Sequence, residues 1–327
     1  MDAVLTCLIT DNIGPNLLSQ RLVQTITRYL NVAGGVAVRR FSDALRFALN
    51  ALGLQPGAKI VISPLSPAIY LNVFDEMGFT PLYADVDSDS ACISVSAVEK
   101  LIQLNPDALL IHAPIGFAPD MEKLIQFGKP IVEDISEALG ANTGIKHAGS
   151  YGRYALISLE PEKIITSGGG AVVLANSRRD LSHLNKVVDT QPEEIFLPDL
   201  NSSLGLIQIG SLEQFIERRK DIAQVFSRAV MKSKHKTLVQ KGDGENIFFA
   251  FPVLLNKGMK DVVQYAMKKK IQVIPAFNKS ALAVRELPDF PCPVARSLML
   301  RCVLFPLYPS LGKANTEEIS KVLSTLP

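Results

Sequence analysis

The first half of the chain alternates short apolar runs with amphipathic segments, and this alternation limits the folds available to it. Residues 42–52 carry apolar side chains at helical spacing, and residues 59–63 (K-I-V-I-S) form an apolar run of the size of a buried strand. The cycle repeats with helices expected at about 67–77, 95–103 and 119–127, and strands at about 79–84, 107–112 and 130–134. Strands separated by helices pair in parallel, because a right-handed crossover needs about a dozen residues. The pattern therefore predicts a three-layer α/β fold with a mainly parallel sheet.

After about residue 176 the pattern changes. It predicts a long helix over 199–232, a glycine-containing turn at 241–244, a strand over 247–254, a helix over 259–269, and strands near Gln272 and Met299. The last segment is typical of a capped helix, with Thr316 as its N-cap. We predict a large domain over residues 1–225 and a small C-terminal α/β domain over 226–327. Gly34 and Gly35 precede a strand and are interpreted as a turn.

Charge and composition exclude several classes of protein. The 34 basic and 32 acidic residues leave a net charge of +2, which gives no reason to expect a nucleic-acid partner. No apolar run approaches 18 residues, and the N-terminus has an acid where a signal peptide carries positive charge. We therefore expect a cytoplasmic protein without a membrane partner. The four cysteines lack the spacing of a metal site, so no metal is expected.

Polar residues follow three predicted strands or helix starts. Ligands bind at the carboxyl ends of parallel strands, and Asp134 ends the strand over 130–134. A strand near 155–157 ends at Ser158 and leads to Lys163, while the first helix starts at 40–42, where free N–H groups can bind an anion. A lysine, an acid and an anion site are the parts that hold pyridoxal phosphate. Spacing alone favours the simpler interpretation, an ordinary exposed lysine and a strand-end acid that caps a helix.

Other candidates have simpler explanations. His112 could act as a base at its strand end, or be a hydrogen-bonded core residue. Asp85 and Asp87 resemble a metal pair but also suit a turn after a strand. The three glycines at 168–170 lack the lysine of a phosphate-binding loop, so we interpret them as a bend.

Six sequence words occur in an order that resembles the DegT/DnrJ family of pyridoxal-phosphate sugar aminotransferases. They are A-V-x-x-x-x-D-A-L-x-x-A-L-x-A-L-G-L-x-P-G from Ala37, G-F-T-P-L-Y-A-D-V-D from Gly78, I-V-E-D-I-S-E-A-L-G-A from Ile131, I-S-L-E-P-E-K-I-I-T-S-G-G-G-A-V-V from Ile157, L-G-L-I-Q-I-G-S-L-E-Q-F-I-E-R-R from Leu204 and F-P-L-Y-P-S-L from Phe305. The resemblance extends from about Gly14 to the end. It implies the fold-type-I transferase architecture.

The resemblance also implies roles for individual residues. Lys163 falls on the Schiff-base lysine, which would carry the cofactor as an internal aldimine and later move the proton. Asp134 falls on the aspartate that keeps the pyridine nitrogen protonated. Ser158 and Ser42 fall on residues that bind the cofactor phosphate.

The chain departs from the family words at several cofactor contacts. Arg40 and Phe41 replace a serine and a glycine of the phosphate loop, although arginine suits phosphate. Pro67 replaces the aromatic that stacks on the ring, and Tyr70 is a candidate substitute. Glu137 replaces a glutamine or histidine that donates to the 3′-oxygen, and a carboxylate there would repel a phenolate unless protonated. The family's N-x-R word, used by the partner subunit, is replaced around residues 194–196.

Two functions remain open on these grounds. The first is an aminotransferase that moves an amino group from an amino acid, with glutamate expected, to a keto-sugar expected to be nucleotide-linked, in a homodimer. The second is a catalytically altered relative that serves as a binding or regulatory protein. The altered contacts motivate the second hypothesis, and the presence of both Lys163 and Asp134 favours the first.

Overall fold

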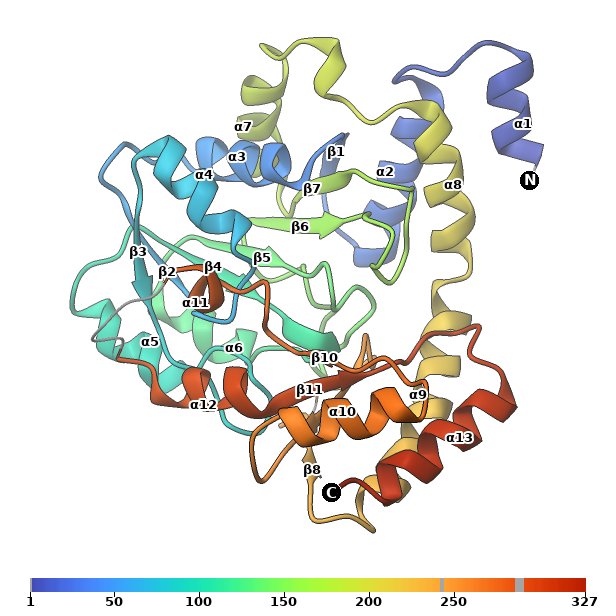
Figure 1. The fold of residues 1–327 in the computed structure, drawn as a ribbon. Coiled ribbons are helices and arrows are strands. Elements are labelled where there is room, and N and C mark those ends of the chain that lie inside the picture. Colours follow the sequence, from blue (N-terminus) through green and yellow to red (C-terminus); the bar gives the residue numbers. More distant parts are fainter. Residues whose placement is uncertain (1, 242–243, 286–290) are drawn as a thin grey trace.

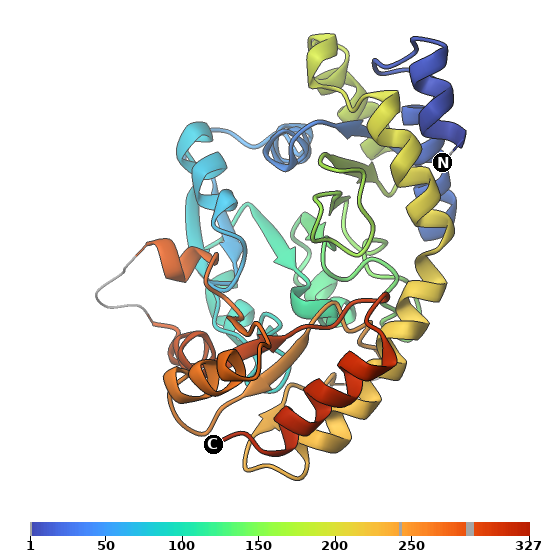
Figure 2. The same ribbon diagram turned by 45° about the vertical axis from the view of Figure 1, so that its right-hand side comes forward.

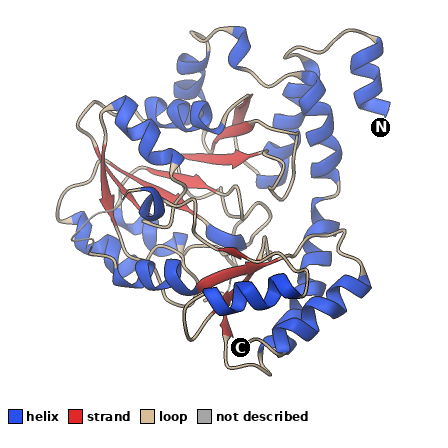
Figure 3. Ribbon diagram, in the orientation of Figure 1, coloured by secondary structure: helices blue, strands red, loops and turns tan. Residues whose placement is uncertain are grey.

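The computed structural model describes residues 2–241, 244–285 and 291–327, which form two β-sheets with helices packed around them (Figures 1 and 3). The larger sheet has the strand order β1-β7-β6-β5-β4-β2-β3. Its strands are β1 (Gly34–Val38), β2 (Lys59–Ile62), β3 (Thr80–Tyr83), β4 (Ala108–His112), β5 (Ile131–Asp134), β6 (Tyr154–Ser158) and β7 (Ala171–Ala175). Strands β2 to β6 pair in parallel, while β7 pairs antiparallel with both β6 and β1. The predicted α/β fold with a mainly parallel sheet is confirmed.

Helices cover both faces of this sheet, and alternate strand residues point to opposite faces. Tyr154 and Leu156 of β6 join one hydrophobic cluster, whereas Ala155 and Ile157 join another. The first cluster includes residues of α3 (Phe41–Ala51), α4 (Ile69–Met77) and α7 (Arg178–Val188). The opposite face packs against α2 (Leu17–Leu30) and α8 (Asp199–Gly210), and further along against α5 (Val95–Ile102) and α6 (Met121–Leu124). This arrangement makes the predicted three layers.

The second sheet has the order β10-β11-β9-β8 and is antiparallel. Its strands are β8 (Lys236–Thr237), β9 (Phe251–Leu254), β10 (Ile274–Pro275) and β11 (Cys302–Phe305). Its core contains residues of α9 (Leu212–Val230), α10 (Lys260–Lys268) and α13 (Lys313–Ser324). Figure 2 shows α8 and α9 following one another along one side of the molecule. The expected domain boundary at 225/226 lies inside α9 and stays a prediction.

The short helices complete the description of the elements. They are α1 (Asp2–Ile9), α11 (Ala281–Val284), α12 (Pro293–Arg301) and the 3₁₀ turns Pro114–Gly116, Ile125–Phe127 and Glu193–Ile195. Within the described ranges, no helix has the length and apolar character needed to cross a bilayer.

Four expectations about local structure are wrong. The helix expected over 199–232 is two helices, α8 and α9, which meet at Ser211. Met299 lies in α12 rather than in a strand, and Thr316 lies inside α13, where its hydroxyl donates to the carbonyl of Gly312 at 3.0 Å. Gly34 and Gly35 belong to β1 instead of a turn. The turn expected at 241–244 includes residues 242–243, which lie outside the described residues.

The segment over residues 276–284, which runs from the end of β10 through α11, returns from the small sheet to the loop after β2. The Ala68 N–H donates to the Lys279 carbonyl at 2.9 Å, and the Ala281 N–H donates to the Ser66 carbonyl at 2.8 Å. The Leu282 N–H donates to a third carbonyl, that of residue 64, at 2.9 Å. The two sheets are therefore joined by main-chain hydrogen bonds close to the carboxyl end of β2, in addition to the chain connection through α8 and α9.

Candidate functional site

Asp134 is a buried, ionised carboxylate at the carboxyl end of β5. Its Oδ2 accepts a hydrogen bond from the Tyr70 hydroxyl at 2.5 Å, and its Oδ1 accepts the Ser136 N–H at 3.0 Å and the Ser136 hydroxyl. Burial by itself would raise the pKa of Asp134, but the His112 imidazole and the two hydroxyls outweigh burial and lower the pKa to about 2. The site therefore contains a fixed negative charge at neutral pH.

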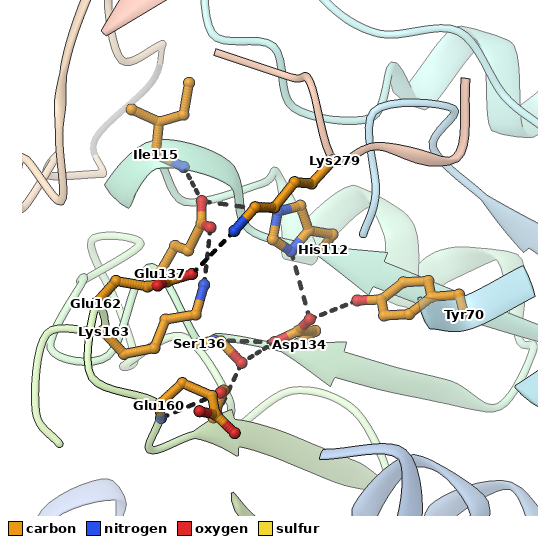
Figure 4. A network of polar contacts seen from close by, with 11 residues as sticks. Tyr70, His112, Ile115, Asp134, Ser136, Glu137, Glu160, Glu162, Lys163 and Lys279 are labelled. Atoms are coloured by element: carbon orange, nitrogen blue, oxygen red, sulfur yellow. Dashed lines mark hydrogen bonds and ion pairs between the residues drawn. The ribbon is translucent and has the colours of Figure 1, made fainter. Parts of the chain in front are cut away.

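His112 ends the neighbouring strand and lies between two acids (Figure 4). Its Nδ1 is 3.5 Å from Oδ2 of Asp134, and its Nε2 is 3.9 Å from Oε2 of Glu137. The side chain is buried, and β4 pairs with β5 so that His112 stands opposite Asp134. His112 thus belongs to the wall of the site, although it lies beside two acids rather than inside an apolar core.

Lys163 lies on the loop between β6 and β7. Three successive glycines, Gly168, Gly169 and Gly170, have φ values of 74°, 135° and 105°, which side chains with a Cβ rarely adopt. They turn the chain so that β7 returns antiparallel to β6. The preceding turn is closed by the Lys163 N–H, which donates to the Glu160 carbonyl at 3.0 Å. This loop places the Lys163 side chain at the same sheet edge as Asp134, with 16% of it exposed.

Glu137 accepts two hydrogen bonds in the loop after β5. Its Oε1 is 3.1 Å from Nζ of Lys163, and its Oε2 accepts the Ile115 N–H at 3.0 Å. Burial by itself would raise the pKa of Glu137, but the charge of Lys163 and then His112 outweigh burial and lower the pKa. For Lys163, burial lowers the pKa, and the Glu137 carboxylate outweighs it, so the pKa is raised. The two side chains form an ion pair at the base of the site.

Two cavities meet at Lys163. The smaller, of about 330 Å³, is lined by Asp134, Ser158, Lys163, Pro67 and the start of α3, among other residues. The larger, of about 850 Å³, extends toward the small sheet. His112, Lys163 and Pro67 belong to the walls of both. Of the eight predicted site residues, Glu137 lines the larger cavity. The other seven line the smaller one: Arg40, Phe41, Ser42, Pro67, Asp134, Ser158 and Lys163.

The start of α3 forms one end of the smaller cavity. Arg40 is the N-cap residue, and its guanidinium binds Asp43 through Nε at 2.8 Å, with 69% of the arginine side chain exposed. Phe41 stacks its ring on that of Tyr70, with centroids 6.3 Å apart and an interplanar angle of 14°. Tyr70 is fully buried and lines neither cavity. The expectation that Tyr70 offers its ring to a ligand is wrong, because the ring lies behind Phe41.

The sequence assigned no role to Ser136 or Ile115, and it gave Tyr70 a different one from the role that the structure shows. Tyr70 and Ser136 hold Asp134, and the Ser136 hydroxyl also accepts the Ser158 N–H at 2.9 Å. The only sequence signal for Ser136 is its position two residues after Asp134, where a side chain can bond locally. Asp85 accepts the N–H groups of Val294 and Ala295 at the start of α12, which favours the structural interpretation of that acid. Among the residues described, no cluster of ligands could hold a metal ion.

The fold and site together define a three-layer α/β enzyme scaffold with a lysine and an ionised acid at one sheet edge. The family model for the DegT/DnrJ/EryC1/StrS aminotransferase family matches residues 3–326. The chain therefore belongs to this family, and it is an enzyme of the aminotransferase class.

Individual relatives are distant but extend over most of the chain. A GDP-perosamine synthase of Escherichia coli O157:H7 is 24% identical over 86% of this chain and 82% of its own. A UDP-N-acetyl-3-dehydro-alpha-D-glucosamine 3-aminotransferase of Acidithiobacillus ferrooxidans is 24% identical over 89% of this chain and 84% of its own. The PLP form of Spr1654 from Streptococcus pneumoniae is similar in structure, with a TM-score of 0.91 at 17% identity over 99% of this chain and 94% of that one. These similarities support the fold and the general reaction class.

Proposed function

We propose that this aminotransferase uses pyridoxal phosphate to move an amino group from an amino acid, glutamate, to the keto carbon of a nucleotide-linked sugar. The observation that carries the proposal is the position of Lys163 and Asp134 on the wall of one cavity. The relatives named for GDP-perosamine and for a UDP-linked keto-sugar support the acceptor class.

The side chains present fit this cofactor. Asp134 is ionised and buried, as a partner for a pyridinium nitrogen must be. The Lys163 amine reaches the same cavity, and the N-terminal end of α3 supplies main-chain N–H groups for a phosphate. When bound, the cofactor supplies the electron sink that makes amino-group transfer feasible. Lys163 would hold the cofactor through its aldehyde and move the proton at its amine nitrogen, Asp134 would keep the ring nitrogen protonated, and Ser158 and Ser42 would hold the phosphate.

The first experiment tests the attachment residue. Purified protein is incubated with pyridoxal phosphate, treated with borohydride and digested, and the modified peptide is identified by mass spectrometry. We expect the reduced cofactor on Lys163 and its loss in Lys163→Ala. Lys279→Ala is the matched control, because this lysine lines the larger cavity with 83% of its side chain exposed. Labelling that is unchanged by Lys163→Ala would refute the assignment.

The second experiment tests the reaction. Glutamate added to the loaded protein should release one 2-oxoglutarate per site, and a nucleotide-linked keto-sugar should then restore the starting absorbance. Bound cofactor without 2-oxoglutarate release would instead favour the binding or regulatory protein. We also propose a homodimer, which sedimentation at several protein concentrations would detect.

A further inference from the structure

The ion pair between Glu137 and Lys163 is more constrained than an ordinary surface pair. Its two side chains are only 19% and 16% exposed, and their atoms are 3.1 Å apart (Figure 4). The Lys163 Nζ also lies 5.3 Å from the centre of the Phe249 ring, which covers another side of the amine. The lysine is thus enclosed by an acid and an aromatic ring before any ligand binds.

The main chain fixes Glu137 independently of the lysine. Ile115 has φ 55° and ψ 23°, a left-handed conformation that is unfavourable for a β-branched residue. In this conformation its N–H donates to Oε2 of Glu137 at 3.0 Å. The next residue, Gly116, has φ 88°, and a Cβ there would come within 2.8 Å of Asn246 Oδ1 and of the Phe249 nitrogen. Packing therefore holds the loop in a strained form that presents one N–H to Glu137.

The charged groups around the pair favour the ionised form of both Lys163 and Glu137. Lys163 faces Glu137 most closely, with Asp134 and Glu162 as further acids that raise the pKa of its amine. Glu137 faces Lys163, whose positive charge lowers the pKa of its carboxyl, and the His112 imidazole acts in the same direction. Glu162 is 66% exposed and lies 3.5 Å from Lys279, so solvent and that lysine weaken its influence. Among these acids, Glu137 therefore has the largest effect on the pKa of Lys163.

The geometry points to Glu137 as a positioning residue that holds Lys163 as an ammonium ion in the cofactor-free protein and keeps its amine from acting as a nucleophile while the ion pair is intact. The amine becomes a nucleophile when it gives its proton to solvent: the N–H bond breaks, water or hydroxide takes the proton, and the nitrogen keeps the electron pair. No oxidant or reductant is needed. This inference rests on the proposed function only in assuming that the free Lys163 amine reacts with the cofactor. The ion pair itself can be tested without cofactor.

The test measures the reactivity of Lys163 in the cofactor-free protein. Trace acetylation across a range of pH, followed by mass spectrometry, gives the pH midpoint for each lysine, because only the neutral amine reacts. Glu137→Gln removes the charge but keeps a side-chain oxygen for the Ile115 N–H. We expect its Lys163 midpoint to fall by one pH unit or more, which is about a tenfold faster reaction at pH 8. Glu162→Gln is the matched control and should change that rate less than twofold.

Two results would overturn the inference. One is an unchanged Lys163 midpoint in folded Glu137→Gln. The other requires no variant: in the unaltered protein the Lys163 midpoint must lie above the ordinary lysine value, and a midpoint at or below it excludes the pairing. A shifted midpoint supports the inference whether or not borohydride fixes cofactor on Lys163. The two experiments therefore distinguish a failure of the proposed function from a failure of the inferred role of Glu137.

Discussion

Replacing Tyr70 with phenylalanine tests the buried charge on which the site depends. The Tyr70 hydroxyl donates to Oδ2 of Asp134 at 2.5 Å, and both side chains are at most 1% exposed. A hydrogen bond to a charged group contributes about 1.5–3 kcal/mol to stability. Asp134 would keep Ser136 and His112 as neighbours, so the free energy of unfolding at pH 7 should fall by about 2 kcal/mol.

The pH dependence gives the sharper test. The folded-state pKa of Asp134 is lowered to about 2, from 3.8. Its charge therefore stabilises the fold above about pH 4, and this contribution disappears as the pH falls through about 2. Because Tyr70 stabilises only the charged form in this way, the difference between Tyr70→Phe and the unaltered protein should be widest above pH 4 and narrow toward pH 2.

Urea unfolding followed by circular dichroism at pH 7 and at pH 3 measures both effects. Tyr265→Phe is the matched control, because its hydroxyl lies 2.8 Å from Thr325 Oγ1 at an exposed position, and it should cost less than about 0.5 kcal/mol. The reasoning is refuted if Tyr70→Phe costs no more than Tyr265→Phe. It is equally refuted if the difference between Tyr70→Phe and the unaltered protein does not depend on pH.

Two further substitutions test the packing that positions the sheet and its helices. Gly35→Ala should lower the free energy of unfolding by about 1–3 kcal/mol, because the added Cβ would lie 2.2 Å from the Val173 carbonyl oxygen. Gly14→Ala is the control, since no atom lies within 4 Å of a Cβ added there. Equal urea midpoints for the two variants would contradict the expected clash. Asp199→Ala should lower the free energy of unfolding by about 2 kcal/mol, because the buried Asp199 carboxylate accepts three N–H groups at the start of α2. Asp189→Ala, at an exposed position, is the control. If Asp199→Ala lowers the free energy of unfolding no more than Asp189→Ala does, these hydrogen bonds contribute little.

Most of the parallel part of the large sheet could be predicted from the sequence, because each of the strands β2 to β5 is a short apolar run preceded by a helical segment. The same reasoning placed Asp134 and Lys163 at one edge, since adjacent parallel strands end together. The antiparallel edge strand β1 could not be predicted in full, because it begins with Gly34 and Gly35, which carry no apolar signal. The reason for Gly34 lies in the packing, where a Cβ would meet Leu181 at 2.7 Å.

The details of the site required the tertiary structure. The sequence marked Glu137 as a departure from the family word, but its ion pair with Lys163 depends on a loop over residues 159–170 whose path is set by glycines. The N–H that Ile115 offers depends on a left-handed conformation that nothing in local propensity predicts for isoleucine. Tyr70 was expected in the cavity and instead lies behind it, because burial depends on what packs in front, here Phe41.

The attachment of the 276–284 segment to the loop after β2 limits how the larger cavity can open. A hinge motion that separated the two sheets there would break three main-chain hydrogen bonds, those made by the N–H groups of Ala68, Ala281 and Leu282. At about 1 kcal/mol each, the open form would represent roughly one molecule in a hundred. If the proposed function holds, a nucleotide-linked sugar would enter mostly through an aperture of nearly fixed width. Selection by size then falls to the side chains at its rim, such as Lys279 and Tyr308, rather than to a closing domain.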